Sequence, residues 1–406
     1  MTPTSTVHPK VVTGLDNLLD SLTQASPMHA GTDLTEIRAL LRSGAVSGLV
    51  SNLSSITRDL RDAGGALLDA GVRLAALFGP EHGSRGAAAA GEKVLSERDR
   101  STGLPVHSLY GHTNRPTPAM LEGIDLMIFD LQDVGTRFFT YIWTLSTVME
   151  ACADAGVPLV VLDRPNPLGG TVEGPLVAPG LESFMGRSPI PIRHGMTMGE
   201  LARLFAERFV PHARVLIAPM RGWERTLCWA DTGLPWAAPS PNLPTPETAT
   251  IYPATCLLEG TNVSEGRGTP LPFRTFGAPW IDPWRLALGL ERDTQSRWRA
   301  LFFSPTAGKY SGAVCGGVEW YSNEQSHAFR PCLLGLQIIH TIKEIYPEEF
   351  HWRQETSGRS HFDLLIGRSD TRHRLDAGDS PEKIAGFWSD DEEEFRQQRA
   401  KFLLYP

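Results

Sequence analysis

The sequence of 406 residues predicts an α/β protein, with a Rossmann-like, doubly wound, mostly parallel sheet domain and a smaller C-terminal α/β (α+β) domain. Short apolar runs alternate with helical patterns through the first two-thirds of the chain. Such nearly continuous apolar runs are typical of parallel strands covered by helices on both faces. The Pro-rich stretch Leu234–Thr248 then leads into a less regular pattern. We therefore expect a Rossmann-like domain over residues 15–235 and a second domain over residues 236–406.

The expected strands follow one another at intervals that leave room for helices. In chain order they lie within Val46–Ile56 and at Val72–Phe78, Asp125–Leu131, Pro158–Leu162 and Ala213–Pro219, with a C-terminal candidate at Ala313–Tyr321. The chain contains neither G-x-G-x-x-G nor G-x-x-x-x-G-K-S/T. The predicted architecture therefore does not imply a bound nucleotide.

The expected helices carry recognisable end signals. They cover Thr57–Ala70, Phe138–Ala155, Thr197–Arg208, Leu333–Ile345 and a C-terminal segment that begins SDDEEEFRQQR. Thr57 is a candidate N-cap, with Gly71 at the end of its helix. Thr197 and Glu200 have the spacing of a capping box. The helix at 138–155 is apolar on most faces, which predicts that it is buried.

Charge and cysteine content narrow the class of protein. Lys and Arg number 38 and Asp and Glu number 46, so the formal net charge is −8, which argues against nucleic acid or an anionic membrane as the main partner. The five cysteines form no C-x-x-C pair, and we expect reduced, mostly buried thiols. The sequence shows no apolar run of about 20 residues and no signal-peptide pattern, so we expect no membrane insertion and a cytoplasmic location. The sequence does not indicate an oligomeric state.

The 39 glycines and 31 prolines have no period, which predicts shaped loops rather than disorder. In an open parallel sheet, ligands bind beyond the carboxyl ends of the strands. Four expected strands run into polar loops at that end: Ser51–Asn52, Phe78–Gly86, Phe129–Phe138 and Leu162–Gly170. Together these loops predict one shared polar cleft, to which Asn52 would contribute.

The loop after the second strand carries the sharpest candidates for catalysis. Glu81 and His82 lie between Pro80 and Gly83, just past a buried strand. Partial desolvation raises the pKa of a carboxyl group and suits it to act as a general acid. The alternative is that Glu81 braces the loop and His82 bonds to the backbone. Arg85 is a candidate either to bind an anionic group of a ligand or to pair with a neighbouring acid.

The loops after the third and fourth strands carry two polar clusters, namely Gln132, Asp133 and Arg137, and then Asp163, Arg164 and Asn166. Asp133 is a candidate to face the cleft, and its alternative is an N-cap or an ion pair with Arg137. A neighbouring Asp163 and Arg164 more often form an orienting ion pair than a catalytic one.

Later loops add Glu173, His194, Asn242, Glu259, Asn262, Glu265 and Arg267. The glycine-rich segment Leu257–Gly268 can bring backbone amides and short polar side chains close to sugar hydroxyls, although a simple connecting loop is the alternative. His194 alone is more typical of a structural histidine. A metal site built from Asp130, Asp133, Asp163, His82 and His194 lacks any H-x-H or H-E-x-x-H pair, and no G-x-S-x-G elbow is present.

Several long segments resemble those of a known family. They are FGPEHGSRG, AGEKVLS, TGLPVHSLYG, DLQDVGTRFFTYI, LDRPNPLGG with VEGP, PIRHGMTMGELA, SPNLPT, and CLLEGTNVSEGRGT with FGAPWID. With these segments the chain resembles the NamZ-type exo-β-N-acetylmuramidases, bacterial glycoside hydrolases once catalogued as a domain of unknown function. The resemblance runs from about Gly14 to the C-terminal FLLYP.

The resemblance implies a two-domain enzyme without a cofactor, which releases N-acetylmuramic acid from the non-reducing ends of peptidoglycan fragments in cell-wall turnover or recycling. The glutamate of the family's G-P-E-H-G segment maps onto Glu81, which is thereby the implied catalytic residue. One departure lies at the first strand, where many relatives read L-L-T-N-Q-T-G and this chain reads LVSNLSSIT. Asn52 is kept there, but the glutamine and glycine that follow it in relatives are not, which affects the substrate contacts expected of this loop.

Glycoside hydrolysis commonly uses two carboxyl groups, about 5–5.5 Å apart for retention or about 6.5–9.5 Å apart for inversion. Glu81 is the candidate acid, and Asp133 and Glu92 are candidates for the second role. Alternatively, the 2-acetamido group of the substrate acts as nucleophile. Candidates for binding the lactyl carboxylate of muramic acid by a bidentate contact are Arg85, Arg137, Arg164 and Arg267. Two other functions stay open, a non-catalytic muropeptide-binding protein and a metal-dependent amide or ester hydrolase acting on amino sugars.

Overall fold

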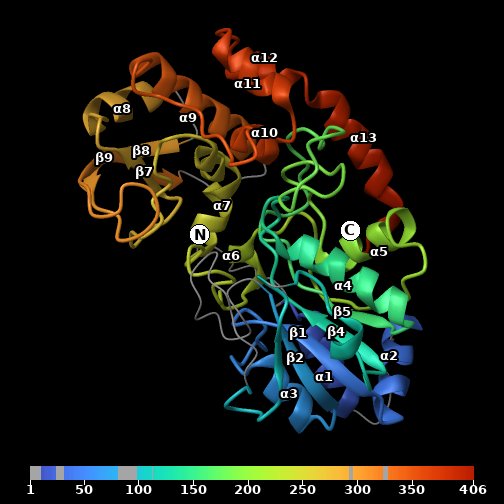
Figure 1. Ribbon diagram of the computed structural model, residues 1–406. Helices are drawn as coiled ribbons and strands as arrows, with labels where there is room; N and C mark the ends of the chain where they lie inside the picture. The colour runs from blue at the N-terminus through green and yellow to red at the C-terminus, as the bar shows by residue number, and fades with distance from the viewer. Residues whose placement is uncertain (1–10, 24–31, 81–97, 112, 292–295, 323–327) are drawn as a thin grey trace, which may run out of the picture.

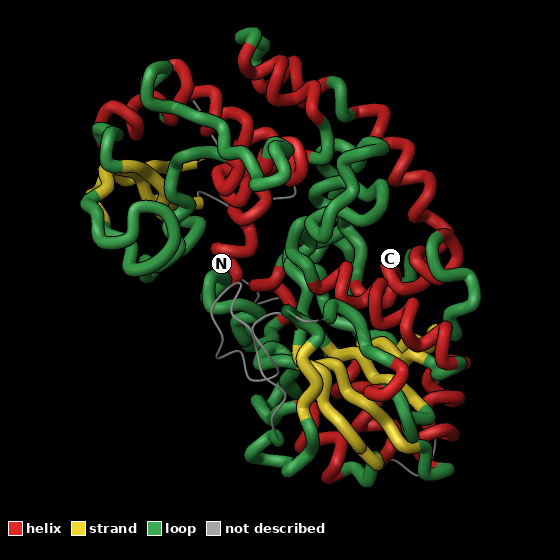
Figure 2. Tube along the Cα trace, viewed as in Figure 1, coloured by secondary structure: helices red, strands yellow, loops and turns green. Residues whose placement is uncertain are grey.

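The computed structural model describes residues 11–23, 32–80, 98–111, 113–291, 296–322 and 328–406. A six-stranded sheet lies in the N-terminal part of the chain, and a three-stranded sheet lies in the C-terminal part (Figure 1). Helices cover the larger sheet, and long loops connect it to the C-terminal part (Figure 2). The predicted α/β class, with a smaller second region of helices and strands, is confirmed.

The larger sheet consists of β1 (Val46–Ser51), β2 (Arg73–Gly79), β3 (Val106–Ser108), β4 (Leu126–Asp130), β5 (Leu159–Leu162) and β6 (Val215–Ala218). All neighbouring strands pair in parallel, in the order β3-β2-β1-β4-β5-β6. The five predicted strands are confirmed, whereas β3 is too short to show as an apolar run in the sequence. The strand order reverses at β1 and β4, and sheets of this kind bind ligands beyond the carboxyl ends of such strands.

Alternate residues of each strand face opposite hydrophobic cores. Leu49 and Ile128 belong to one core, while Val50 and Phe129 belong to the other. The first core includes α1 (Gly14–Thr23), α2 (Thr32–Arg42) and α3 (Ala63–Asp69), and the second includes α4 (Tyr141–Ala155) and α5 (Met198–Arg208). Because both faces of each strand are buried, the strands appear in the sequence as continuous apolar runs, as a doubly wound sheet requires.

The helix predicted to start at Thr57 begins six residues later, at Ala63. The Thr57 hydroxyl accepts a hydrogen bond from the Arg61 N–H at 3.1 Å, so this threonine stabilises a turn and does not cap a helix. Asp62 is the actual N-cap of α3, since its carboxylate accepts from the Gly65 N–H at 2.9 Å. Both residues are good caps in sequence terms, and the turn between them decides which one is used.

Two other helix predictions hold more closely. The capping box of Thr197 and Glu200 is confirmed at the start of α5. The helix predicted at 138–155 begins at Tyr141 as α4, and most of its residues are buried, as expected. The residues just before α4 are therefore in a loop at the carboxyl edge of the sheet.

The C-terminal part begins with α7 (Pro246–Thr255) and η2 (Cys256–Gly260), after the Pro-rich connection. Its antiparallel sheet has the order β7-β9-β8, formed by β7 (Thr275–Ala278), β8 (Ser296–Phe303) and β9 (Cys315–Ser322). The predicted strand at 313–321 and helix at 333–345 are confirmed as β9 and α9 (Pro331–Ile345). The other elements are η1 (Pro118–Met120), α6 (Trp229–Thr232), α8 (Pro283–Leu290), α10 (His361–Ile366), α11 (Ser369–Asp376), α12 (Pro381–Gly386), α13 (Ser389–Arg399) and η3 (Ala400–Phe402).

Helix α13 returns from the C-terminal part to the larger sheet (Figure 1). Arg399, at its end, donates hydrogen bonds to the carbonyl oxygens of Gly170 and His194 at 2.7 and 2.9 Å. The Tyr405 hydroxyl then donates to Asp163, at the carboxyl end of β5, at 2.6 Å. The end of the chain therefore stabilises the loops at the carboxyl edge of the sheet. The domain boundary at residues 235 and 236 stays a prediction.

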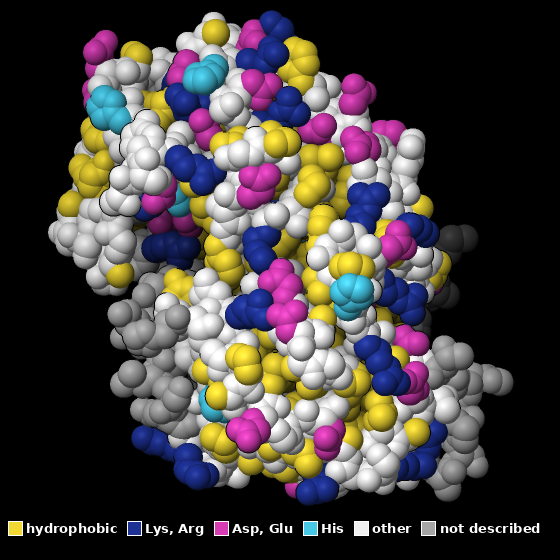
Figure 3. Space-filling view, turned by 45° about the vertical axis from the view of Figure 1, so that its right-hand side comes forward, with side chains coloured by type: hydrophobic (Ala, Val, Ile, Leu, Met, Phe, Trp, Pro, Cys, Tyr) yellow, Lys and Arg dark blue, Asp and Glu magenta, His cyan; other side chains and the backbone are white. Residues whose placement is uncertain are grey.

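The described surface mixes charges of both signs, and Figure 3 shows basic and acidic side chains interspersed over one face. All five cysteines are free, and four of them are buried, as predicted. Within the described residues, no helix has both the length and the apolar character needed to cross a bilayer.

Candidate active site

A cleft lies between the carboxyl edge of the larger sheet and the segment formed by α7 and η2. Its cavity volume is about 240 Å³. The side chains that line it come from both parts of the chain: Tyr110, Phe138, Phe139, Thr140, Tyr141, Phe184, Met185, Ser240, Asn242, Leu243, Tyr252, Cys256, Glu259, Arg267, Phe273 and Leu365. The sequence predicts a polar cleft at this edge of the sheet, and the structure places a cavity there.

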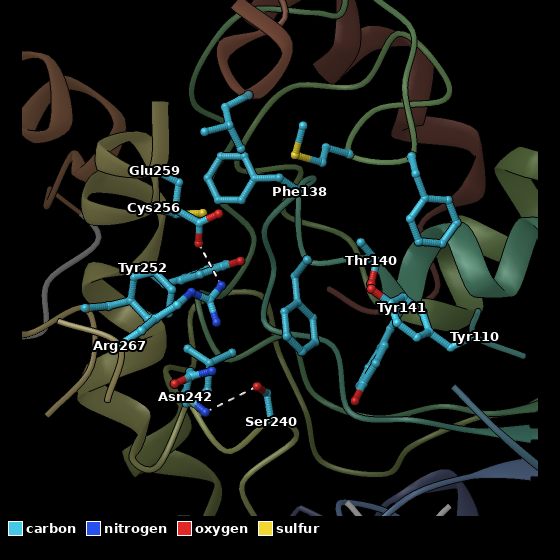
Figure 4. Close-up of a pocket in the computed structure, with 16 residues that line it drawn as sticks. Tyr110, Phe138, Thr140, Tyr141, Ser240, Asn242, Tyr252, Cys256, Glu259 and Arg267 are labelled. Atoms are coloured by element: carbon cyan, nitrogen blue, oxygen red, sulfur yellow. Dashed lines mark hydrogen bonds and ion pairs between the residues drawn. The ribbon is translucent and has the colours of Figure 1, made fainter. Parts of the chain in front are cut away.

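The sheet side of the cleft presents hydroxyl groups and aromatic rings. Tyr110 follows β3, and Phe138, Thr140 and Tyr141 lie where the chain passes from β4 into α4 (Figure 4). Hydroxyl groups can exchange hydrogen bonds with sugar hydroxyls, and an aromatic ring can cover the apolar face of a pyranose. This wall therefore has the chemistry of a carbohydrate site.

Asn52, at the end of β1, holds this wall together. Its Nδ2 donates to the Tyr141 hydroxyl at 2.7 Å and to the Pro239 carbonyl oxygen at 3.2 Å. The Tyr141 hydroxyl also donates to the Pro239 carbonyl oxygen, at 2.6 Å. Asn52 is buried and therefore positions the loop that carries Ser240 and Asn242, and it does not line the cleft itself.

The opposite wall carries the charged groups. Tyr252 comes from α7, Cys256 and Glu259 come from η2, and Arg267 comes from the loop that follows (Figure 4). Arg267 Nη2 donates to Glu259 Oε1 at 2.7 Å, and the guanidinium carbon lies 5.0 Å from the centre of the Phe273 ring. The arginine is thus held from one side by a carboxylate and from another by an aromatic face.

The electrostatic attraction between Glu259 and Arg267 keeps both side chains ionised. Burial alone would raise the pKa of Glu259, but the Arg267 guanidinium, with His361 and Lys309, outweighs burial and holds the pKa below its usual range. Burial would likewise lower the pKa of Arg267, and the attraction of Glu259 raises it instead. Both groups are therefore ionised at neutral pH, so Glu259 can supply a fixed negative charge and not a proton. Burial raises the pKa of the Cys256 thiol, which keeps it unreactive.

A second carboxylate stands behind the pair. Glu265 Oε1 lies 3.4 Å from Arg267 Nε, and Glu265 Oε2 lies 3.1 Å from Lys309 Nζ. Lys309 also donates to the carbonyl oxygens of Leu258 and Val263, at 2.9 Å each. This network ties the predicted glycine-rich segment into a defined loop, in which Glu265 is a support and Glu259 and Arg267 reach the cleft.

Asp133 does not line the cleft, contrary to the expectation that it faces the substrate. Its Oδ2 accepts from the Gly135 N–H at 2.8 Å and lies 3.2 Å from His194 Nε2. His194 Nδ1 in turn accepts from the Met196 N–H at 3.2 Å. Both side chains are buried and neither lines the cleft, so their contact supports the loop that leads to the sheet-side wall. The substrate-binding role expected of His194 stays a prediction.

Arg137 is also buried, and its hydrogen bonds are to backbone. Nη1 donates to the Pro175 and Ile190 carbonyl oxygens at 2.8 Å each, and Nη2 donates to the Leu365 carbonyl oxygen at 2.7 Å. Burial lowers the pKa of Arg137 to about 9. The ion pair with Asp133 is not formed, because Nη1 and Nη2 of Arg137 join two loops to the last turn of α10. Arg137 does not line the cleft, and its expected contact with an anionic ligand stays a prediction.

Arg164 is likewise paired within the fold. It makes a bidentate contact with Asp130, at 2.5 and 2.8 Å, and not the ion pair expected with its neighbour Asp163. Asp163 instead accepts from the Thr197 hydroxyl at 2.7 Å and from the Tyr405 hydroxyl at 2.6 Å. Burial raises the pKa of Asp163 to about 6. Neither Arg164 nor Asp163 lines the cleft, and the ligand contacts expected of them stay predictions.

Four further predicted residues hold backbone at a distance from the cleft. Gln132 Nε2 donates to the Pro165 carbonyl oxygen at 2.7 Å, Asn166 Nδ2 to that of Met196 at 3.0 Å, and Asn262 Nδ2 to that of Glu349 at 2.7 Å, while Glu173 Oε1 accepts from the Leu333 N–H at 3.0 Å. Of the predicted binding residues that the structure describes, Asn242, Glu259 and Arg267 line the cleft.

Glu81, His82, Arg85 and Glu92 lie outside the described residues. The preceding residue, Pro80, is buried directly after β2, at the same edge of the sheet as the cleft. Among the described residues, no group of three His, Cys, Asp or Glu side chains is arranged to hold a metal ion.

The sequence reasoning missed the aromatic and hydroxyl groups of the cleft, including Tyr110, Phe138, Tyr141, Tyr252 and Phe273. The run FFTY before α4 was the available signal, because a cluster of aromatic residues at a strand end can form the wall of a sugar site. The sequence pattern instead assigns these residues to a helix, because they also suit a buried helix.

Comparisons with known proteins match nearly the whole chain. Residues 47–247 match the family model described as exo-beta-N-acetylmuramidase NamZ, N-terminal, and residues 250–405 match the corresponding C-terminal model. The chain is 42% identical over 404 residues to the peptidoglycan beta-N-acetylmuramidase NamZ of Bacillus subtilis (strain 168), covering 98% of this chain and 92% of that protein.

Two solved structures share the fold, and both are DUF1343 family proteins from Bacteroides fragilis NCTC 9343. One has a TM-score of 0.85 and 32% identity, and the other has a TM-score of 0.75 and 29% identity. Each comparison covers 98% of this chain and 99% of the other. The two family models, the curated relative and these structures agree over nearly the full length, and the chain therefore belongs to the NamZ exo-β-N-acetylmuramidase family.

Proposed function

We propose that this chain is an exo-β-N-acetylmuramidase, a glycoside hydrolase that releases N-acetylmuramic acid from the non-reducing ends of peptidoglycan fragments during cell-wall turnover or recycling. The observation that carries this proposal is the match of both NamZ family models, together covering residues 47–247 and 250–405, with 42% identity to a curated peptidoglycan β-N-acetylmuramidase. Its substrate would be an amino sugar or muropeptide derived from peptidoglycan. The cytoplasmic location expected from the sequence stays a prediction.

The described cleft supports a sugar substrate. One wall carries the hydroxyl groups of Tyr110 and Thr140, and the other carries the ionised Glu259 and Arg267. Aromatic rings and convergent polar groups in one cavity are the usual composition of a small-molecule site. A terminal amino sugar with a carboxylate offers partners for both walls.

In the proposed reaction, Glu81 is the general acid that protonates the leaving oxygen of the glycosidic bond. This assignment follows from the resemblance of the GPEHG segment, and it agrees with the position of Pro80 at the carboxyl end of β2. For the second role we propose either Glu92 or the 2-acetamido group of the substrate. Asp133 is buried against Gly135 and His194, and we propose that it braces the loop before α4.

The test is hydrolysis of a chromogenic β-N-acetylmuramide compared with the matching β-N-acetylglucosaminide. We expect the muramide to be cleaved much faster. The Glu81→Gln variant should lose about 100- to 10,000-fold in kcat while its melting temperature stays near that of the wild type, as the loss of a general acid predicts. Glu122→Gln is the matched control, because Glu122 is exposed and does not line the cleft.

Three outcomes would count against parts of this proposal. Binding of the sugar in calorimetry without any product would favour the non-catalytic binding protein. Activity that disappears on exhaustive chelation and returns with added metal would favour the metal-dependent hydrolase. Turnover by Glu81→Gln at the rate of the wild type would remove Glu81 from the role of acid.

A further inference from the structure

The cleft has one positive charge among the residues that the structure describes. Its lining includes two ionisable groups of opposite sign, Glu259 and Arg267, both from the C-terminal wall. The Arg267 side chain is 26% exposed and that of Glu259 is 17% exposed, so both are largely withdrawn from bulk water. A charge in such a site acts on a ligand with little screening.

The backbone holds Arg267 in place from both sides. Gly266 has a left-handed φ of 78°, and a Cβ there would lie 2.1 Å from the Thr275 carbonyl oxygen. The Phe273 N–H donates to the Glu265 carbonyl oxygen at 2.7 Å, which closes the loop over the arginine. A guanidinium presented by so fixed a loop loses little conformational entropy when a ligand binds.

The contacts of the guanidinium leave one nitrogen for a ligand. Nη2 donates to Glu259, at 2.7 Å, and Nε lies 3.4 Å from Glu265, whereas Nη1 has no hydrogen-bond or ion-pair partner among the described residues. Glu265 also pairs with Lys309, at 3.1 Å, so it compensates the charge of Arg267 only in part. Nη1 and the second hydrogen of Nη2 together form the edge that a carboxylate can accept from in bidentate fashion.

The other arginines considered for an anionic group are committed elsewhere or lie outside the described residues. Arg137 is fully buried on three carbonyl oxygens, and Arg164 makes a bidentate contact with Asp130. Arg85 belongs to the part of the chain that the structure does not describe. Of the described candidates, Arg267 alone lines the cavity.

We propose that Arg267 recognises the lactyl carboxylate of a terminal N-acetylmuramic acid, with Glu259 as the positioning residue that orients its guanidinium. This inference rests on the proposed function and names the specificity-determining residue of that site. Muramic acid differs from glucosamine by the lactyl ether alone. With a glucosaminide, the free edge of Arg267 would face the bound sugar without a carboxylate acceptor, so the charge-assisted contact that favours the muramide would be lost.

The test measures kcat/KM for three chromogenic substrates, namely the β-N-acetylmuramide, its lactyl methyl ester and the β-N-acetylglucosaminide. The wild type should prefer the acid over the ester by about 10- to 100-fold, which is the range of a charge-assisted contact. In Arg267→Gln this preference should fall to about threefold or less, because the acid loses rate and the ester does not. Arg267→Lys, which keeps the charge and loses the bidentate edge, should be intermediate.

The ratio of acid to ester is measured on one sample, so it does not depend on the fraction of a variant that folds. Arg214→Gln is the matched control, since Arg214 is 59% exposed, pairs with Glu36 and lies outside the cleft. A wild-type acid-to-ester ratio in Arg267→Gln would overturn this inference and leave the proposed function standing. No cleavage of the muramide by the wild type would instead overturn the proposed function.

Discussion

Two loops of this molecule place an arginine one or two residues after a left-handed glycine and use the arginine in opposite ways. At the sheet edge, Gly135 has a φ of 76° and stands two residues before Arg137, and in the C-terminal part, Gly266 has a φ of 78° and directly precedes Arg267. In both loops a Cβ on the glycine would clash with an oxygen atom, 2.3 Å away in Asn166 and 2.1 Å away in Thr275. Each loop therefore requires a glycine at this position.

The partners of the two arginines differ. Arg137 is fully buried and donates to three carbonyl oxygens, two in loops and one in the last turn of α10, where the backbone oxygens need donor partners from outside the helix. Arg267 is anchored by carboxylates on one side and keeps an edge toward the cleft. We infer that the described polar residues at the sheet edge mostly stabilise the fold, and that the C-terminal loop supplies the specificity.

The largest expected effect is on stability and concerns Arg137, the arginine that joins distant segments of the fold. Arg137→Met should lower the free energy of unfolding by about 3–5 kcal/mol, because it leaves the buried carbonyl oxygens of Pro175, Ile190 and Leu365 without their donor. The activity per folded molecule should stay within about threefold of the wild type. Urea unfolding and activity assays check both expectations, with Arg214→Gln as control. A loss of substrate preference with normal stability would contradict this role.

A pH dependence of stability is the next largest effect. Burial raises the pKa of Asp163 to about 6 from its ordinary 3.8, so the folded state holds this proton more tightly than the unfolded state. The resulting stabilisation is complete below pH 3.8 and is lost as the pH rises through about 6. In Asp163→Asn this loss of up to about 3 kcal/mol should be absent.

Urea titrations of both proteins between pH 4 and about 7 measure this effect as the difference between their unfolding free energies. The difference isolates Asp163 from the other buried acids. Parallel pH profiles for the wild type and Asp163→Asn would show that Asp163 does not titrate in this range.

For Glu259, which lines the cleft, we expect a substitution to affect activity and to have little effect on stability. Glu259→Ala removes the acceptor that orients Arg267 and should lower kcat/KM for the muramide about tenfold, with a change of less than about 1.5 kcal/mol in unfolding free energy. Glu355→Ala is the matched control, since Glu355 pairs with His361 behind Glu259 and has no contact with Arg267. Equal losses of activity in both variants would argue against a specific role of Glu259.

Asn242 should show the smallest effect. Its side chain lines the cleft and has no hydrogen-bond partner among the described residues, so Asn242→Ala should change the unfolding free energy by less than about 0.5 kcal/mol. If the amide contacts bound substrate, KM for the muramide should rise about threefold with kcat unchanged, as for a contact made equally in ground and transition states. A lower melting temperature with an unchanged KM would instead give Asn242 a structural role.

The fold was accessible from the sequence because strands buried on both faces leave an unmistakable apolar pattern, as in β4 and β5. The capping box of Thr197 and Glu200 was accessible for a similar reason, since both partners are local. The cap at Thr57 was predicted wrongly because Thr57 and Asp62 are both favoured N-cap residues, and the turn that separates them selects Asp62. Short β3 was missed because three residues carry no period.

The sequence by itself determined the doubly wound sheet, the family and the loops that gather at one edge of the sheet, because each of these depends on the order and polarity of residues along the chain. It did not determine which way each polar side chain turns. Arg137 and Arg267 both follow a glycine in a polar loop, and only the packing of distant segments assigns carbonyl oxygens to one and a cleft to the other. The physical reason is that a buried donor must find an acceptor, and the nearest acceptor is supplied by residues far away in the chain, such as Leu365 for Arg137.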